Sequence, residues 1–295
     1  MDLKRYLLEK RESVDSFFRD YFKEQRRPAV LQESMLYSLF AGGKRVRPIL
    51  AMAAYEACGG DPGDIVPYAS SLELIHTYSL IHDDLPAMDD DDLRRGKPTN
   101  HKVYGEAVAI LAGDALLTEA FCILSDPAHG RKVKEGDLLS ASKEIATAAG
   151  YQGMVAGQVQ DILSEDAEAD GETLRFIHRH KTAALIRASV KVGGILFGSS
   201  AERVGALTLY GENIGHAFQV IDDILDVEGD TEELGKSVGS DEKINKMTYP
   251  RLYGLERSRE IAKKLVDDAV SSLDVFSLSA DPLREIACYM LERRN

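Results

Sequence analysis

The sequence is poor in cysteine. Its 295 residues include three cysteines, Cys58, Cys122 and Cys288, which stand far apart in apolar surroundings. An odd number of widely spaced cysteines argues against a disulfide framework or a metal knuckle and is typical of reduced core thiols. We therefore expect a cytosolic location.

Positive charge is also scarce, since 36 Lys and Arg residues face 49 Asp and Glu residues and leave a net charge of −13. An acidic surface repels phosphate backbones and anionic lipid, so nucleic acid and membrane surfaces are not expected partners. Two segments, 83–92 and 222–233, together hold thirteen acids and no Lys or Arg. They account for the whole excess of negative charge, so the acidity belongs to two local sites.

Long apolar runs are missing as well. The N-terminus, MDLKRYLLEKRESVDSFFRDYF, is charged throughout and does not resemble an export signal. No window approaches the roughly 20 apolar residues that span a bilayer, so we expect no stable membrane association. The motifs of serine hydrolases, zinc proteases, P-loop enzymes, kinases and dinucleotide-binding proteins are absent, which excludes those classes.

Helical periodicity is what the sequence does contain. Apolar residues recur at three- and four-residue spacing, as in residues 36–40 and 49–53, and no convincing pair of alternating strands is present. The nine prolines fall between these helical segments or near their ends. The pattern predicts an all-α protein, and because no linker or repeat divides the chain we expect residues 1–295 to form a single domain.

Two aspartate clusters each follow an apolar helical segment. Two carboxylates about 4 Å apart repel each other by roughly 4 kcal/mol at an effective dielectric near 20, and neither cluster contains a cation. Each cluster is typical of a binding site for Mg²⁺, which binds carboxylates together with substrate phosphates. A solvated acidic helix end is the alternative for either cluster alone. The predicted metal ligands are Asp83, Asp84, Asp89, Asp222, Asp223 and Asp226.

Basic residues gather near the aspartates. The segment GGKRVRP places Lys44, Arg45 and Arg47 after two glycines, and LRRGKP places Arg94 and Arg95 directly after the first cluster. Glycines let the backbone approach an anion, and arginine forks match phosphate oxygens. Opposite charges side by side suggest that Mg²⁺ bridges one diphosphate while Lys and Arg hold another.

One long connection, 229–249, begins inside the second acidic segment and carries Lys236, Lys243 and Lys246. Loops of this length in a compact domain tend to be functional. We favour a lid over an anionic ligand, and a surface insertion is the alternative.

Six segments occur in one order: LFAGGKRVRP, ELIHTYSLIHDDLPAMDDDDLRRGKPTNHKVYGEAVAILAGDALL, GQVQDI, HKTAALI, FQVIDDILDVEGD and LGKSVGSDEKINKMTYP. In this order and spacing they resemble the bacterial trans-isoprenyl diphosphate synthases, in particular the short-chain farnesyl diphosphate synthases. The resemblance implies many antiparallel helices around a large central cavity, with the two aspartate motifs facing each other at its mouth. It also implies a homodimer and several Mg²⁺ or Mn²⁺ ions per active site.

The resemblance further implies roles for individual residues. The six aspartates, Arg94 and Lys181 would be catalytic, with the metal held on the allylic diphosphate. The residues expected to contact the allylic substrate are Arg94, Lys181, Thr182, Gln219 and Lys236. The residues expected to bind isopentenyl diphosphate are Gly43, Lys44, Arg47, His76 and Arg95.

In the implied reaction the allylic diphosphate leaves, the double bond of isopentenyl diphosphate attacks the carbocation, and a proton is lost to the departed diphosphate. Tyr78 and Ser79 lie five and four residues before Asp83, where side chains would limit the growing tail. An aromatic residue at the fifth position is typical of bacterial farnesyl synthases, so we expect Tyr78 to form the cavity floor.

We therefore expect a farnesyl diphosphate synthase, or geranyltranstransferase, that extends dimethylallyl and geranyl diphosphate to fifteen carbons. The alternative is a geranylgeranyl diphosphate synthase of the same fold. From another class, a non-catalytic regulatory subunit of a prenyl synthase is the less favoured alternative, because both the carboxylates and the cations are intact. A terpene cyclase is excluded, since it would lack the second aspartate motif and has no use for GGKRVRP.

Overall fold

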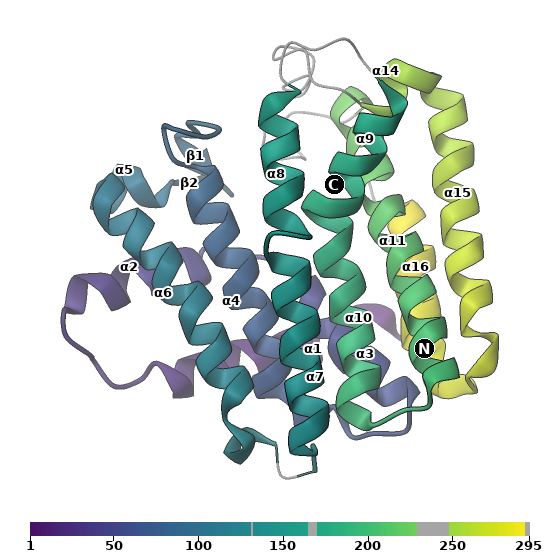
Figure 1. Ribbon diagram of the computed structural model, residues 1–295, viewed down its shortest axis with the longest axis horizontal. Coiled ribbons are helices and arrows are strands. Elements are labelled where there is room, and N and C mark those ends of the chain that lie inside the picture. The colour runs from purple at the N-terminus through teal and green to yellow at the C-terminus, as the bar shows by residue number, and fades with distance from the viewer. Residues whose placement is uncertain (131, 165–169, 229–247, 293–295) are drawn as a thin grey trace.

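Helices make up almost all of the computed structural model, which confirms the predicted all-α fold (Figure 1). The structure describes residues 1–130, 132–164, 170–228 and 248–292. The first α-helices are α1 (Leu3–Tyr21), α2 (Ala29–Leu39), α3 (Val46–Ala57), α4 (Val66–Asp83), α5 (Asn100–Tyr104), α6 (Glu106–Ser125) and α7 (Glu135–Ala149). The later ones are α8 (Met154–Leu163), α9 (Gly171–Ile177), α10 (Ala184–Phe197), α11 (Ala201–Glu228), α14 (Tyr249–Tyr253), α15 (Leu255–Ser272) and α16 (Asp281–Glu292).

Short helical turns join several of these helices. A π-helical turn, His178–Ala183, runs directly from α9 into α10, so the three segments form one continuous helix that is locally widened. The 3₁₀ turns are Pro62–Ile65, Pro127–His129, Leu273–Val275 and Leu278–Ala280.

The long helices pack side by side, with α10 between α3, α7 and α11, α4 against α6, and α15 on the outer side of α11. Figure 1 shows that α4, α8 and α11 all reach their C-terminal ends at the same end of the molecule. Because both predicted aspartate clusters lie at or beyond the C-terminal ends of α4 and α11, this arrangement brings the clusters together.

A two-stranded hairpin interrupts the helical pattern beside the end of α4. Its strands, β1 (Leu93–Arg94) and β2 (Lys97–Pro98), are antiparallel. The two turn residues, Arg95 with φ 53° and Gly96 with φ 74°, have the left-handed backbone that a tight two-residue hairpin turn requires. We predicted no strands. Two residues per strand are too few to show alternation in the sequence.

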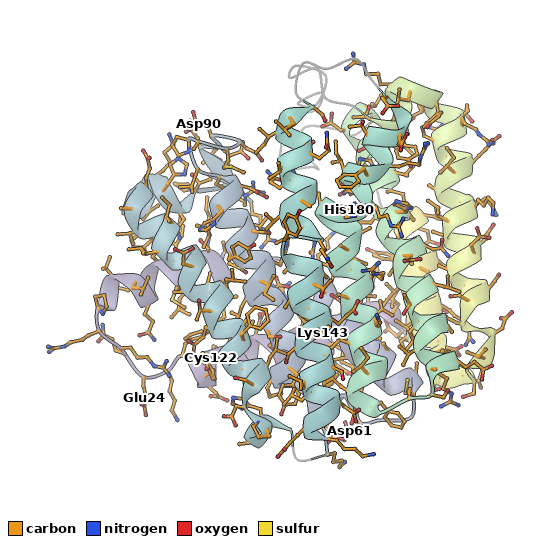
Figure 2. The ribbon with its side chains drawn as sticks, viewed as in Figure 1. Glu24, Asp61, Asp90, Cys122, Lys143 and His180 are labelled. Atoms are coloured by element: carbon orange, nitrogen blue, oxygen red, sulfur yellow. The ribbon has the colours of Figure 1, made fainter. Side chains whose placement is uncertain are left out.

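Two of the three cysteines are not in the core. All three are free, and Cys58 is buried, but Cys122 and Cys288 are exposed. Figure 2 shows Cys122 on the outer side of α6. Their apolar neighbours in the sequence pack inward, while the helical turn points these two thiols outward.

Helix α6 is more apolar than we expected. Within the described residues it is the one helix that is long and apolar enough to cross a membrane, judged by length and composition alone. About 39% of that stretch is buried inside the molecule. A partly buried core helix meets the same criterion, so this observation is weak evidence for a membrane span.

Helices α3 and α10 approach closely at Gly193. The facing residues of α3, Ala51 and Ala54, are small and fully buried. A Cβ atom added at Gly193 would collide with the carbonyl oxygen of Ala51 and lie 2.8 Å from the amide nitrogen of Tyr55. Because both obstacles are backbone atoms, a larger residue would have to push the two helices apart.

We therefore expect Gly193→Ala to lower the free energy of unfolding by about 1–3 kcal/mol, because overpacking forces the backbone to shift. Gly205→Ala is the matched control, since Gly205 is an exposed residue of α11 with open space around its Cβ position. It should be neutral or raise the free energy of unfolding by about 0.5–1 kcal/mol. Urea unfolding followed by circular dichroism measures both, and equal effects of the two changes would contradict the close-approach argument.

Candidate active site

A cavity of about 930 Å³ lies between α4, α8, the π turn and α11. Its volume is at the upper end of the roughly 300–1,000 Å³ found for small-molecule sites. Most of the predicted site residues line it. These are Arg47, His76, Tyr78, Ser79, Asp83, Asp89, Arg94, Lys181, Thr182, Gln219, Asp222, Asp223 and Asp226.

Four predicted residues are described but are not among the lining residues of this cavity: Gly43, Lys44, Asp84 and Arg95. Asp84 is buried, and its Oδ1 atom accepts a hydrogen bond of 2.5 Å from the Nε atom of Arg94. The structure thus places Asp84 behind Arg94, which itself reaches the cavity. Lys236 and the rest of the predicted lid, up to residue 247, lie outside the described residues.

The first aspartate cluster is shaped by the backbone that follows α4. The amide of Asp89 donates a hydrogen bond of 2.9 Å to the carbonyl oxygen of Asp83, which folds the loop back on the helix end. Burial raises the pKa of Asp83 to about 6, although Lys181 and Arg94 act in the opposite direction. An ionised Asp83 is therefore costly until a further positive charge arrives.

The second cluster lies on the last turns of α11. Asp223 is buried, and its Oδ2 atom accepts a hydrogen bond of 2.9 Å from the amide of Tyr249, at the start of α14. The same oxygen lies 3.8 Å from Nε2 of His178 in the π turn. The ring of His178 stacks on that of Tyr249 at 5.4 Å. Three segments far apart in the sequence therefore fix this carboxylate.

The π turn presents Lys181 to the cavity. Its Nζ atom lies 2.6 Å from Oδ2 of Asp161 on α8. Helix α8 comes this close because residue 157 is glycine: a Cβ there would lie 2.6 Å from the Cα atom of Lys181. π turns inside α-helices occur frequently at functional sites, and here the turn carries both Lys181 and Thr182.

The lining residues that sequence reasoning missed include Gln158, Asp161 and His178. The segment GQVQDI, which contains the first two, contributed to the resemblance but no role was assigned to its residues. His178 had no local signal, because its partners Asp223 and Tyr249 lie 45 and 71 residues further along the chain.

A basic region, formed by Arg47 and His76, lines the same cavity as the aspartates. Burial, followed by the charges of Arg47, Arg95 and Arg94, holds the pKa of His76 well below its ordinary value. His76 is therefore a neutral imidazole at pH 7. The Nε atom of Arg47 is buried and has no hydrogen-bond partner within the described part of the chain. A neutral imidazole beside several guanidinium groups suits a polyanion.

Tyr78 and Ser79 both line the cavity, on different sides of α4. The ring of Tyr78 packs edge-on against His82 at 5.5 Å, and Nε2 of His82 lies 3.0 Å from the carbonyl oxygen of Ile110 on α6. Tyr78 therefore shares the side of α4 on which His82 meets α6. Ser79 is about 40° around the helix from Asp83, against about 140° for Tyr78.

The donor set fits a hard divalent cation that arrives with an anionic ligand. Within the described residues, no three acidic, His or Cys side chains stand close enough together to form a complete metal site. Mg²⁺ commonly uses one or two carboxylates and takes its other ligands from water and phosphate. The desolvated carboxylate of Asp83 gains most from such an ion, since burial opposes its charge.

Removing the charge of Asp83 should stabilise the metal-free protein. The pKa of Asp83 in the folded state, about 6, exceeds the ordinary 3.8, so the native state holds this proton more tightly than the unfolded chain does. Wild-type stability should therefore fall as the pH rises from about 4 to about 6, and Asp83→Asn should remove that fall. At pH 7 we expect a gain of about 1–2 kcal/mol in the free energy of unfolding.

Urea titrations at pH 4 to 7 in EDTA measure this effect. Asp92→Asn is the control, because a hydrogen bond from Lys102 lowers the pKa of Asp92 and reverses the sign of its contribution. If the free energy of unfolding rises between pH 4 and pH 6 by the same amount in the wild type and in Asp83→Asn, the assignment is refuted.

The sequence matches known proteins over most of its length. A model of the family described as polyprenyl synthetase matches residues 28–275. Geranylgeranyl pyrophosphate synthase 11, chloroplastic, of Arabidopsis thaliana is 49% identical over 298 residues, covering 100% of this chain and 83% of that protein. Heterodimeric geranylgeranyl pyrophosphate synthase large subunit 1, chloroplastic, of the same plant is 48% identical over 298 residues, covering 100% and 80%.

Solved structures of similar proteins share the fold. A geranylgeranyl pyrophosphate synthetase from Pyrococcus horikoshii superposes with a TM-score of 0.88 at 32% identity, covering 99% of this chain and 98% of that chain. An apo FPP/GFPP synthase from Zymomonas mobilis gives 0.86 at 35% identity, covering 98% and 99%. The predicted resemblance and the all-α fold are confirmed.

The cytosolic location that we expected is wrong, because the curated relatives are named chloroplastic. Free cysteines indicate a reducing environment, but they do not distinguish one reducing compartment from another.

Proposed function

The chain belongs to the polyprenyl synthetase family, and from that premise we propose that it makes geranylgeranyl diphosphate from isopentenyl diphosphate and allylic diphosphates. It is a trans-prenyltransferase. The observation that carries the proposal is the meeting of both aspartate clusters, Lys181, Arg94 and the basic region in one cavity with apolar walls. We propose that the whole chain acts as one domain.

Twenty carbons are favoured over the fifteen that we expected. Relatives 48–50% identical over the full chain are named geranylgeranyl pyrophosphate synthases. The contact of Tyr78 with His82, which meets α6, supports the same product, because a ring held on that side of α4 would leave space beneath Asp83. Farnesyl diphosphate is the second candidate, since Tyr78 still lines the cavity and one structural neighbour is an FPP/GFPP synthase.

The allylic diphosphate would lie between the aspartate clusters. Asp83, Asp89, Asp222 and Asp226 would hold divalent metal on it, and when bound the metal neutralises charge on the leaving diphosphate. Lys181 would contact the same leaving group, from the position where Asp161 now holds it. Arg94 would reach the diphosphate from the hairpin side, anchored by Asp84.

Isopentenyl diphosphate would occupy the basic region. Arg47 and His76 would bind it inside the cavity, while Gly43, Lys44 and Arg95 would bind it from the adjoining loop. This diphosphate does not leave, so its contacts serve binding and orientation. The apolar walls, including Leu85, Ile177 and Phe218, would exclude water from the carbocation. The proton lost from the adduct would go to the departed diphosphate.

Chromatography of the dephosphorylated products tests the proposal. With Mg²⁺ and isopentenyl diphosphate we expect dimethylallyl, geranyl and farnesyl diphosphate all to be extended to twenty carbons, and EDTA to stop the reaction. Ser79→Phe should shorten the product, because its ring would fill the space below Asp83. Tyr78→Ala should still give a product of at least twenty carbons.

Two outcomes would change the conclusion. A fifteen-carbon wild-type product that Tyr78→Ala lengthens would replace the proposal by the farnesyl candidate. Full activity of Asp83→Ala would reject the prenyltransferase site itself, since we expect a loss of orders of magnitude. Asp90→Ala is the matched control and should retain activity, because Asp90 is exposed beside the hairpin and is not among the lining residues (Figure 2).

We also propose that two copies of the chain pair through the face formed by α6, α7 and α8. These helices carry exposed apolar side chains, and patches of this kind mark interaction sites. The exposed apolar residues of these helices that do not line the cavity are Leu111, Leu139 and Leu163. One relative is named as a heterodimeric large subunit, so a different chain is the other partner to consider.

Light scattering should give twice the chain mass of 32.5 kDa for the wild type. Leu111→Glu should yield monomers, because a charge in an apolar interface is left without a partner. Leu278→Glu is the control, as Leu278 is exposed on a different part of the molecule. A monomeric wild type would contradict the homodimer.

A further inference from the structure

Arg45 lies in the same loop as the proposed diphosphate ligands but does not line the cavity. Its side chain is 2% exposed. The Nε atom donates to Oδ1 of Asp15 on α1 at 2.9 Å, and Nη1 donates to Oε1 of Glu73 on α4 at 3.0 Å. Nη2 donates to the carbonyl oxygen of Leu39, the last residue of α2, at 2.7 Å. One guanidinium therefore joins three helices.

The same side chain also holds the loop between α2 and α3. Nη1 of Arg45 lies 3.4 Å from the carbonyl oxygen of Gly42, which also accepts a hydrogen bond from Arg95. The backbone of Arg45 is left-handed, with φ 53°, and helix α3 starts at the next residue. A non-glycine residue in this conformation is unfavourable by itself. The hydrogen bonds of the Arg45 side chain compensate for the cost of this backbone conformation. They therefore fix the start of α3 and, with it, the position of Arg47.

Glu73 connects this loop to the other half of the site. It is buried, and a buried carboxylate requires a cation and hydrogen bonds. Arg45 supplies both. His76 follows Glu73 on α4 by three residues, about 4.5 Å along the helix axis. The Arg45–Glu73 pair thus sets the spacing between the loop that carries Arg47 and the helix that carries His76.

We propose that Arg45 is a positioning residue for isopentenyl diphosphate. It touches no substrate and holds Arg47 and the 42–44 loop at the correct distance from His76. The inference rests on the proposed function and adds a determinant of affinity for one of the two substrates. The allylic site depends on other contacts, chiefly those of Lys181 and Arg94.

Steady-state kinetics on the full chain, with each substrate varied in turn, tests the proposal. Arg45→Gln should raise the KM for isopentenyl diphosphate about tenfold or more, because a displacement of about 1 Å is enough to weaken oriented binding. The KM for the allylic substrate and kcat at saturation should stay within about threefold, since a lost ground-state contact appears mainly in KM. Arg45→Lys keeps the charge and should recover part of the affinity.

Two further variants separate positioning from general damage. Arg45→Gln leaves Glu73 without its buried cation, so the double variant Arg45→Gln with Glu73→Gln removes both charges at once. It should fold and should still show the raised KM. Arg11→Gln is the matched control, because Arg11 pairs with Asp15 at 3.6 Å from the exposed side and does not contact the loop. Its KM values should equal those of the wild type.

The results distinguish this inference from the proposed function. If the wild type forms prenyl products but both Arg45→Gln and the double variant keep the wild-type KM for isopentenyl diphosphate, the positioning role is refuted. The same holds if folded variants raise the KM for both substrates equally. If the wild type forms no prenyl product with Mg²⁺, the proposed function fails and this inference fails with it.

Discussion

Electrostatic repulsion between carboxylates that share one cavity is the constraint on which the site depends. Six carboxylates line one cavity: Asp83, Asp89, Asp161, Asp222, Asp223 and Asp226. In water such a group would spread apart, but helix ends hold it together and burial raises the pKa of Asp83. Lys181 and the amide of Tyr249 relieve part of the repulsion. The remaining negative charge is the reason why we propose that metal and diphosphate bind in this cavity together.

The two proposed diphosphate sites differ in character. At the aspartate side the negative charge is in excess, so that in the proposed function cations would bind together with the leaving group. At the basic side, Arg45 has its partners inside the protein, whereas Arg47 has a buried Nε atom without one in the described chain. Arg45 and Arg47 therefore differ in role, although they are two residues apart. Arg45 stabilises the fold, and Arg47 is available to a ligand.

Much of the site could be predicted from the sequence because its chemistry is concentrated in short segments. Charge counting and helical periodicity located both aspartate clusters. Contacts between distant segments could not be predicted. Asp84 turns away from the cavity because Arg94, ten residues later, folds back on it, and His178 meets Asp223 only after the bundle forms. The hairpin and the exposure of two cysteines could not be predicted either, because they depend on turn geometry and on how the helices pack.

Product length shows most clearly why residue identity is not enough. An aromatic residue five positions before Asp83 predicts a short product only if its ring lies across the cavity. The direction of the Tyr78 ring is set by His82, and His82 is held by the carbonyl oxygen of Ile110 on another helix. Tyr78, His82 and Ile110 all lie within the segment from which the prediction was made, but residue spacing alone does not show that they meet. The direction of the Tyr78 ring therefore depends on a neighbouring helix as well as on the position of the residue in the motif.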